Sequence, residues 1–297
     1  MFGLLVILGV SVVTFSLTYV VPADPALVIA GPRATAEAIA NIRAQLGLDR
    51  PLYVRYGEYA WGLLHLDLGK SYLRNRPVLG QILDRFGATA ELALACVLMQ
   101  LLIGLPVGIV SAVKQHSLSD RASMLFSLFF LSAPPFWLGL VLLFLLGFLV
   151  PIFPLGGYGT PLHVVLPALT LGLSGSAWYA RMLRSSMLDI LSADYVRTAR
   201  AKGLREQIVV IRHALQNAIP AILTMAGMDL GRFAGGLIVV ESVFGWPGIG
   251  QLALEALYNF DVPMVMGVVL FGSTLVVAMN LLVDVAYGFL DPRIKYQ

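Results

Sequence analysis

Two glycine-rich motifs are where this sequence could bind a nucleotide. Leu68-Gly-Lys-Ser71 has the ending of a phosphate-binding loop, but that loop needs a glycine five residues before its Gly-Lys pair, and position 64 is Leu. Gly245-Trp-Pro-Gly-Ile-Gly250 follows an apolar stretch with no βαβ unit, so a turn is favoured over a dinucleotide site. We therefore predict that the chain binds no nucleotide.

Gly172-Leu-Ser174-Gly175 is the pattern with catalytic potential, because rhomboid-type intramembrane proteases carry a serine nucleophile in a Gly-x-Ser-Gly motif of their fourth span. That nucleophile needs a histidine base, which rhomboids place in the sixth span. None of the histidines lies in the last apolar stretch of this chain; they are His65, His116, His163 and His213. We expect these small residues to pack helices together, and we keep a rhomboid-like protease as a remote alternative.

The composition indicates a membrane protein. Of 297 residues, 58% are apolar and 12% charged, and the mean hydropathy is +0.83, whereas soluble domains carry about 25% charged residues. An ordinary soluble enzyme is excluded, and a net charge of +3 gives little support for nucleic-acid binding. The single cysteine, Cys96, excludes an intrachain disulfide, and no His/Cys cluster predicts a metal or other cofactor.

Long windows without charge predict six transmembrane helices. Each window is long enough to cross the hydrocarbon core, which takes about 20 residues of helix. The prolines and glycines of 151–161 divide the longest window into two spans. Continuous apolar runs favour helices over barrel strands, so we expect an all-α membrane protein. We expect several of these helices to be kinked at the prolines inside the spans: Pro106, Pro134, Pro135, Pro167 and Pro220. The six expected spans lie within 1–23, 92–113, 124–149, 163–183, 216–240 and 262–283.

Lysine and arginine residues in the connections predict the orientation. The second and fourth connections and the C-terminal tail are basic, whereas 151–162 and 241–261 contain neither residue. By the positive-inside rule, both termini and the connection 185–215 are cytoplasmic. The first span lacks a basic leader and exceeds the usual signal-peptide core, so we expect it to be retained. We expect two parts: 1–85, the first helix with a long extracytoplasmic loop, and 86–297, a five-helix core.

The fourth connection predicts two short helices joined by a glycine. Asp194 lies in the first turn of a short helix, Arg200 and Lys202 lie in its last turn, and Gly203 follows as a left-handed C-cap. In the second helix Ile208, Ile211 and Leu215 would share one face. We predict a rigid cytoplasmic protrusion that docks a partner. The alternative is a basic loop that only fixes the topology.

The fifth span carries charges inside the membrane, which favours a functional role. At 100° per residue, Gly227, Gly231 and Gly235 form a Gly-x-x-x-Gly packing face. Residues on the far side could line a water-filled path; they are Met225, Asp229, Arg232 and Gly236. Asp229 and Arg232 are spaced to pair. The alternative is a structural ion pair that holds two helices together.

The fourth connection also resembles a known family. Tyr195-Val-Arg-Thr-Ala-Arg-Ala-Lys-Gly-Leu204 and Arg212-His-Ala-Leu-Gln-Asn-Ala-Ile-Pro220 are similar to the EAA loop of ABC importer permeases, in the dipeptide, oligopeptide, glutathione and nickel branch. Arg197 and Thr198 stand where that loop usually has glutamate and its first alanine. The chain resembles the first of the two permeases that such importers contain. Further motifs match this branch; they include Leu46-Gly-Leu-Asp-Arg-Pro-Leu-Tyr53, Leu66-Asp-Leu-Gly-Lys-Ser71, Glu241-Ser-Val-Phe-Gly-Trp-Pro-Gly-Ile-Gly250, Asn280-Leu-Leu-Val-Asp-Val-Ala-Tyr287 and Asp291-Pro-Arg293.

The resemblance implies a type I ABC importer permease fold and a non-enzymatic subunit of a bacterial or archaeal plasma-membrane importer. Its partners would be a second permease, two cytoplasmic ATPases and an extracytoplasmic binding protein. The implied substrate is a di- or oligopeptide, with glutathione or a nickel complex as alternatives. A secondary transporter would need an internal repeat of spans, which we do not find. The residues implied to couple to the ATPase are Asp194, Tyr195, Arg197, Thr198, Ala199, Arg200, Lys202, Gly203 and Leu204.

The first connection contains an aromatic run of Tyr53, Tyr56, Tyr59 and Trp61. By the same resemblance, this run would lie on the outer surface near the binding protein. Tyrosine and tryptophan are also enriched at membrane interfaces. A lid lying on the membrane surface is therefore the alternative.

The charge asymmetry predicts that 185–212 is cytoplasmic and 23–87 is extracytoplasmic. Single cysteines at Ser192 and Thr35, in a background with Cys96 replaced, should respond oppositely to an impermeant maleimide added to intact cells. Position 35 should be labelled and position 192 protected until the cells are opened. Labelling of position 192 from outside would overturn the topology.

Overall fold

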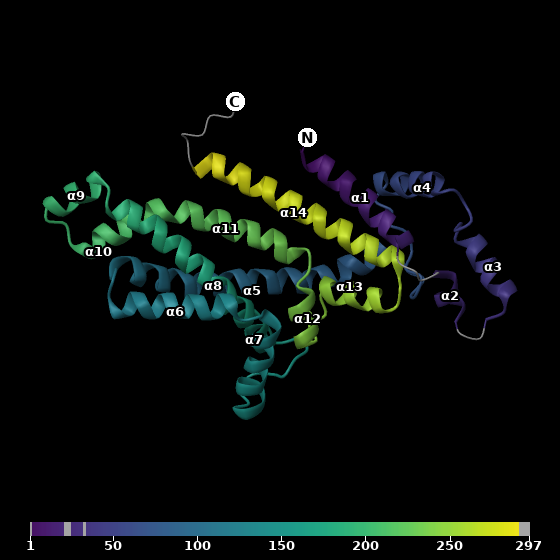
Figure 1. The fold of residues 1–297 in the computed structure, drawn as a ribbon, viewed down its shortest axis with the longest axis horizontal. Helices are drawn as coiled ribbons and strands as arrows, with labels where there is room; N and C mark the ends of the chain where they lie inside the picture. Colours follow the sequence, from purple (N-terminus) through teal and green to yellow (C-terminus); the bar gives the residue numbers. More distant parts are fainter. Residues whose placement is uncertain (1, 21–24, 32–33, 291–297) are drawn as a thin grey trace. The chain divides into compact units, whose positions relative to one another are not determined.

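The computed structural model describes residues 2–20, 25–31 and 34–290, and the regular secondary structure of this part is helical (Figure 1). In those residues the β pairing is limited to one isolated bridge between Lys70 and Pro77. Two of the segments, η1 and η2, are π-helical. The elements are α1 Phe2–Val20, α2 Pro25–Ala30, α3 Ala36–Gln45, α4 Leu52–Leu64, α5 Val78–Val113, α6 Leu118–Ser132, α7 Pro135–Leu142, η1 Leu143–Leu149, α8 Pro161–Leu191, α9 Asp194–Ala201, α10 Glu206–Ile208, η2 Val209–Leu215, α11 Gln216–Ala234, α12 Ile238–Phe244, α13 Ile249–Tyr258 and α14 Val262–Leu290.

The chain divides into two compact units, which we describe separately. The first unit comprises Met1–Ala90, Arg232–Ser242 and Pro247–Val277. The second comprises Glu91–Gly231, Val243–Trp246 and Ala278–Gln297. These units follow contacts within the chain, and the predicted organisation into 1–85 and 86–297 stays a prediction.

Three helices among the described residues are long and apolar enough to cross a membrane: Val78–Val113, Glu206–Ala234 and Val262–Ala286. The pair Leu118–Ser132 and Pro135–Leu149 raises this number to four if the two count as one broken span. The apolar part of α1, Gly3–Ser16, is shorter. The described residues thus contain several helices suited to cross a membrane, and the count of six spans stays a prediction.

The expected span at 124–149 is sharply bent, as its internal prolines predict. It consists of α6 followed by α7 and η1, and the two parts meet at an angle of 103°. Ala133 and Pro134 have extended backbone angles, with ψ of 125° and 134°. Two consecutive prolines explain the break, because a proline donates no hydrogen bond and disfavours the helical conformation of the residue before it.

The expected fifth span at 216–240 is too long at its C-terminal end. Helix α11 stops at Ala234, and a separate helix, α12, starts at Ile238. Gly236 has φ +115°, a conformation that glycine adopts without a Cβ penalty. The amide of Gly236 bonds the Phe233 carbonyl at 3.0 Å, which closes the last turn. Composition did not predict the end of α11, because the residues that follow it are also apolar.

Close contact between α5 and α8 organises the second unit. A Cβ atom on Gly104 would lie 2.7 Å from the Tyr179 Cβ, and one on Gly172 would lie 2.6 Å from the Met99 Cβ. A Cβ on Gly175 would collide with the Gln100 side chain. These glycines let two backbones approach closely, as small residues do in membrane helices. The prediction that Gly172-Leu-Ser174-Gly175 packs helices is confirmed.

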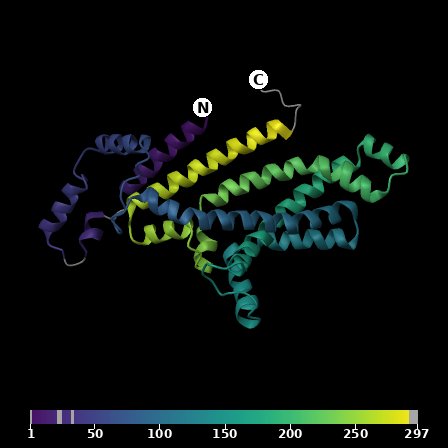
Figure 2. The same ribbon diagram turned by 180° about the vertical axis from the view of Figure 1, so that it is seen from behind.

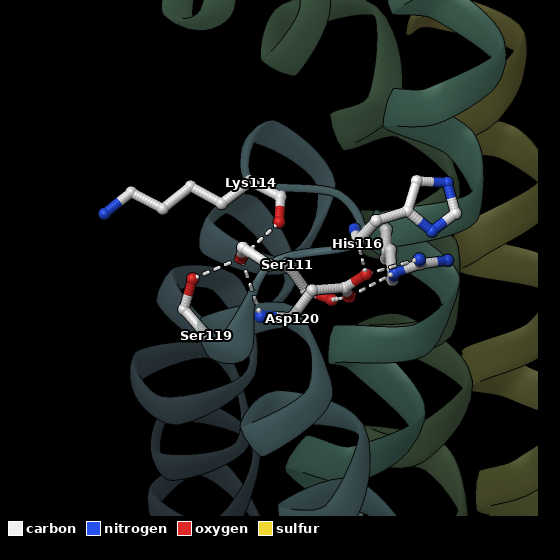
Figure 3. A network of polar contacts seen from close by, with 7 residues as sticks. Ser111, Lys114, His116, Ser119 and Asp120 are labelled. Atoms are coloured by element: carbon white, nitrogen blue, oxygen red, sulfur yellow. Dashed lines mark hydrogen bonds and ion pairs between the residues drawn. The ribbon is translucent and has the colours of Figure 1, made fainter.

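A buried ion pair fixes the start of α6 to α8 in the second unit (Figure 3). Asp120 is 3% exposed and accepts from Arg184 Nε at 2.9 Å and Nη2 at 3.0 Å. Its carboxylate also accepts from the Ser111 hydroxyl and from the His116 amide. One carboxylate therefore joins α5, the α5–α6 turn, α6 and α8.

A second buried carboxylate organises the first unit. Glu241 is fully buried and accepts from Thr89 Oγ1 at 2.9 Å, the Gln251 amide at 2.8 Å and the Leu237 amide at 3.3 Å. Thr89 Oγ1 in turn accepts from the Ile249 amide at 2.8 Å. Burial raises the pKa of the Glu241 carboxyl, and these donors oppose that rise. The motif that begins at Glu241 is thus a structural turn, as expected for a sequence without a dinucleotide site.

Ser71 likewise has a structural role. Its hydroxyl donates to Asp261, whose other carboxylate oxygen accepts from the Tyr72 amide at 3.0 Å. Arg74 Nη2 lies 2.8 Å from Glu255 Oε2. These bonds attach the end of the first connection to the α13–α14 region of the same unit. Ser71 of the Gly-Lys-Ser sequence therefore serves a tertiary contact.

The aromatic run of the first connection lies on α4 and divides between two sides. The rings of Tyr56 and Tyr59 pack against Phe15 of α1, with centroids 5.2 and 5.9 Å away. Tyr53 and Trp61 are 77% and 67% exposed. Half of the run therefore anchors α4, and the other half is exposed.

Removal of the Asp120 carboxylate should destabilise the second unit. Asp120→Ala leaves the Arg184 guanidinium uncompensated, which typically costs about 3 kcal/mol. Asp194→Ala is the matched control, because its ion pair with Arg197 is exposed and 3.5 Å long, and such pairs contribute less than about 1 kcal/mol. We expect Asp120→Ala, in contrast to Asp194→Ala, to lower the temperature at which the solubilised chain loses its monodisperse size-exclusion peak. Equal midpoints for the two variants would contradict this assignment.

Candidate functional site

The short helix of the fourth connection, α9, ends as the sequence predicts. Asp194 lies in its first turn, Arg200 in its last, and Gly203 has φ +76°. The Gly203 amide bonds the Arg200 carbonyl at 2.9 Å, and the Leu204 amide bonds the Ala199 carbonyl at 3.4 Å. These two bonds form a Schellman motif, so the left-handed C-cap at Gly203 is confirmed.

Arg200 connects the three helical segments around this turn. Its Nε and Nη2 donate to the Glu206 carboxylate at 3.1 and 2.8 Å, and its Nη1 donates to the Leu191 carbonyl at 3.4 Å. The bond to Glu206 raises the pKa of the Arg200 guanidinium. The end of α8, α9 and the start of α10 are therefore held together.

A small apolar core lies beneath α9. Val196 and Val209 are fully buried, Ala199 is 7% exposed, and Ile190 and Leu191 pack against them. Ala199 thus contributes by fitting into the core. The other predicted coupling residues are exposed: Asp194, Tyr195, Arg197, Thr198, Arg200, Lys202, Gly203 and Leu204.

The second helix differs from the predicted one. It starts at Glu206 and continues through η2 into α11 without interruption, so it is long rather than short. Its buried residues in η2 are Val209, Val210 and Ala214, whereas Ile208 and Ile211 are 40% and 60% exposed. The exposure of both isoleucines agrees with a shared face, Leu215 is partly buried, and the π-helical geometry of Val209–Leu215 was not predicted.

Within the second unit, α9, α10 and the α5–α6 turn lie at the same end (Figures 1 and 2). The basic second and fourth connections are therefore at one side of this unit. This arrangement agrees with the prediction that both connections face the same compartment.

The predicted path residues are divided between the two units. In the second unit, Asp229 Oδ2 accepts from the Tyr179 hydroxyl at 3.0 Å, and Tyr179 is fully buried. Met225 is partly buried. In the first unit, the Arg232 guanidinium carbon lies 5.0 Å from the centroid of the Phe233 ring.

Arg232 and Gly236 line a cavity of about 380 Å³ in the first unit, between α1, the end of α11 and α14. Gly236 does so from the turn after α11, because that helix ends at Ala234. The expectation that Gly236 continues a helical face with Asp229 and Arg232 is therefore wrong. Apart from Arg232, the lining is mainly valine and glycine, with a hydroxyl from Ser273.

The glycine face of α11 packs against α14. A Cβ on Gly227 would collide with Val283, and one on Gly235 would lie 3.3 Å from the Gly272 Cα. Each contact lies within one unit. For Gly227 and Gly235 the predicted packing role is confirmed.

Sequence reasoning missed the buried carboxylates Asp120 and Glu241. Asp120 lies 64 residues from Arg184, and Glu241 lies 152 residues from Thr89. A charged residue next to an apolar window was the available signal, because such a charge needs a partner. The sequence did not identify that partner.

The ring nitrogens of His65 and His163 bond the Trp61 carbonyl and the Thr160 hydroxyl, at 2.9 and 2.7 Å. In the described residues no group of three or more metal-ligating side chains is found.

Two family models match the chain. Residues 104–296 match the binding-protein-dependent transport system inner membrane component, and residues 1–93 match the N-terminal part of such membrane components. Together these matches cover nearly the whole sequence.

Several transport proteins are similar over almost their full length. The dipeptide transport system permease protein DppB of Escherichia coli K12 is 37% identical, over 98% of this chain and 95% of that protein. The glutathione transport system permease protein GsiC of Salmonella choleraesuis is 40% identical, and a putative peptide transport system permease protein of Brucella abortus is 39% identical, each with the same coverage.

Among solved structures, inward-facing forms of the MetNI methionine ABC transporter have a similar fold. The two TM-scores are 0.56 and 0.60, at 20% and 19% identity, with 71% of this chain covered. The match covers 95% and 96% of the MetNI chains. At this identity the likeness concerns the fold alone.

Proposed function

The chain belongs to the family of binding-protein-dependent transport system inner membrane components, and from that premise we propose that it is a permease subunit of an ATP-driven peptide importer. The observation that carries this proposal is the 37 to 40% identity to dipeptide, peptide and glutathione permeases over 98% of the chain. Hydrolysis of ATP would belong to partner subunits. A rhomboid-like protease and a secondary transporter have no comparable support.

The proposed assembly contains a second permease, two cytoplasmic ATPases and an extracytoplasmic binding protein. The chain would cross the plasma membrane six times, with α1 and α8 as spans besides the apolar helices, and with both termini in the cytoplasm. The basic fourth connection would then face the ATPases. The aromatic first connection would face the binding protein, with a membrane-surface lid as the alternative.

We assign ATPase coupling to α9 and the turn at Gly203. The exposed surface of this region combines charge with apolar area, since Tyr195 and Leu204 are 48% and 39% exposed. Arg200 and the small core under α9 fix it to α8 and to the helix that continues into α11. Movement of the docked helix would therefore be transmitted to α8 and α11 as a rigid body, exchanging inward- and outward-facing states.

We assign the translocation path to the polar side of α11. Arg232 beside an apolar cavity supplies a cation that could meet a peptide carboxylate. Asp229 supplies a carboxylate that could meet a peptide amine. The competing assignment is structural, and the bond from Tyr179 to Asp229 supports it.

Di- and oligopeptides are the proposed substrate class. Glutathione is a second candidate, because the similarity to GsiC is as high as that to the peptide permeases. A nickel complex is the remaining candidate of this branch. Deletion of the gene from its host should abolish uptake of labelled di- and tripeptides, and reintroduction of the wild-type gene should restore it. Loss of glutathione or nickel uptake alone would replace the peptide assignment.

The same uptake assay tests Gly203 as a coupling turn. No atom lies within 4 Å of a Cβ built there, so a side chain fits in space but strains the left-handed backbone by about 1–2 kcal/mol or more. We expect Gly203→Val to insert normally and to lose transport, and Gly203→Asn to keep most of it.

Gly87→Val is the matched control, because Gly87 also has open space around it but an ordinary helical backbone. That variant should transport peptide. If Gly203→Val still imports substrate and stimulates ATP hydrolysis, the coupling assignment is wrong.

Asp229 and Arg232 are tested by comparing Asp229→Asn and Arg232→Gln with the double variant, for assembly and for uptake. A path role predicts normal assembly of all three variants with lost or altered uptake. If the single variants fail to assemble and the double variant recovers, only a structural pair remains.

A further inference from the structure

A cavity of about 660 Å³ lies between α5, α6 and α8 in the second unit, and neither proposed site uses it. Three arginines line it: Arg121 from the first turn of α6, and Arg181 and Arg184 from α8. Four serines add hydroxyl groups to the lining. Its volume lies in the range of about 300–1,000 Å³ that is usual for small-molecule sites.

The positive charge of this cavity is only partly neutralised. Arg184 is paired with Asp120, through Nε and Nη2 (Figure 3). Within the described part of the chain, Arg121 and Arg181 form no ion pair. The Arg181 guanidinium carbon lies 5.8 Å from the centroid of the Trp178 ring. Two guanidiniums therefore remain available to an anion.

An apolar surface continues from the cationic end. Met124, Leu125 and Leu128 line the same cavity and are each more than half exposed. They follow Arg121 at i+3, i+4 and i+7, so they lie on one face of α6. At 1.5 Å per residue this face extends about 10 Å along the helix. The cavity thus combines a cationic end with an apolar strip.

This combination matches an amphiphilic anion with its charge at one end. Basic pockets between transmembrane helices bind anionic lipid headgroups, and a phosphate is an anion that arginine binds through two parallel hydrogen bonds. The exposed Trp178 beside Arg181 is typical of the membrane–water boundary. A small free anion would leave the exposed leucines and methionine without a partner.

We propose that this cavity binds an anionic phospholipid, with the phosphate at Arg121 and Arg181 and the acyl chains along Met124, Leu125 and Leu128. The lipid would come from the leaflet on the side of the α5–α6 turn, which is the cytoplasmic side in the proposed topology. Binding there would join α6 to α8 beside the Asp120–Arg184 pair. The site is separate from the peptide path and from the coupling turn.

The test uses the full chain, purified in detergent and titrated with phosphatidylglycerol, phosphatidylcholine or inorganic phosphate, with bound lipid counted by native mass spectrometry. The pocket variant is Arg121→Gln with Arg181→Gln, and the control is Arg205→Gln with Arg212→Gln, which removes the same charge from exposed arginines of the fourth connection. We expect the pocket variant to bind phosphatidylglycerol roughly thirtyfold more weakly. The control should bind it as the wild type does.

Three results would overturn the proposal. Equal phosphatidylglycerol binding by both double variants would mean that the cavity does not select the lipid. Equal affinity for phosphatidylcholine would mean an apolar groove without headgroup recognition. Full displacement of the lipid by inorganic phosphate would mean a small-anion site. A charge-conserving variant, Arg121→Lys with Arg181→Lys, guards against misfolding, because it should keep the preference for phosphatidylglycerol.

Discussion

The connection between α8 and α11 depends on the hydrogen bonds that the Arg200 guanidinium donates. The guanidinium bonds the last carbonyl of α8 and both carboxylate oxygens of Glu206, so one side chain closes the turn around Gly203. An exposed ion pair contributes little by itself, at most about 1 kcal/mol. The burial of Val196 and Val209 beneath it therefore supplies most of the stability, and Arg200 determines the geometry. A helix held in this way can transmit a displacement to α8 and α11 instead of bending.

Buried carboxylates follow one rule in both units: each receives donors from several segments. Asp120 is bonded from α5, the α5–α6 turn and α8, and Glu241 from α5, from the amide at Leu237 and from the start of α13. Removal of one partner of a buried ion pair is destabilising, whereas replacement of the whole pair by well-packed apolar residues is often neutral, so for Asp120 and Arg184 specificity of packing is the better account of their presence. An arrangement that misplaced one segment would leave a charge without donors in an apolar region. The free-energy cost of such a buried charge disfavours the other packings that apolar helices allow.

Local features were predictable from sequence, and long-range ones were not. The left-handed C-cap at Gly203 follows from local charge and glycine chemistry, and the packing role of Gly172 follows from small size, so both could be predicted. Prolines predicted kinked helices, but not the 103° angle at Pro134. The π-helical turn at Val209–Leu215 and the end of α11 at Ala234 escaped prediction, because neither composition nor periodicity specifies them. The partner of Asp120 could not be identified, because nothing local to residue 120 specifies Arg184. Within the candidate site, the turn at Gly203 was predicted from the sequence, whereas the cavity beside Arg232 was identified only in the structure.

The tight packing of α11 on α14 restricts how a path could open. A Cβ on Gly227 would collide with Val283, and a Cβ on Gly235 would be in tight contact with Gly272. Backbones in such contact cannot slide past each other without collisions, since packed interfaces change between discrete arrangements rather than deform continuously. The two helices should therefore move as a pair. Alternating access would then open surfaces that this chain leaves unpacked, which is consistent with a path formed together with a second permease instead of one enclosed within a single chain.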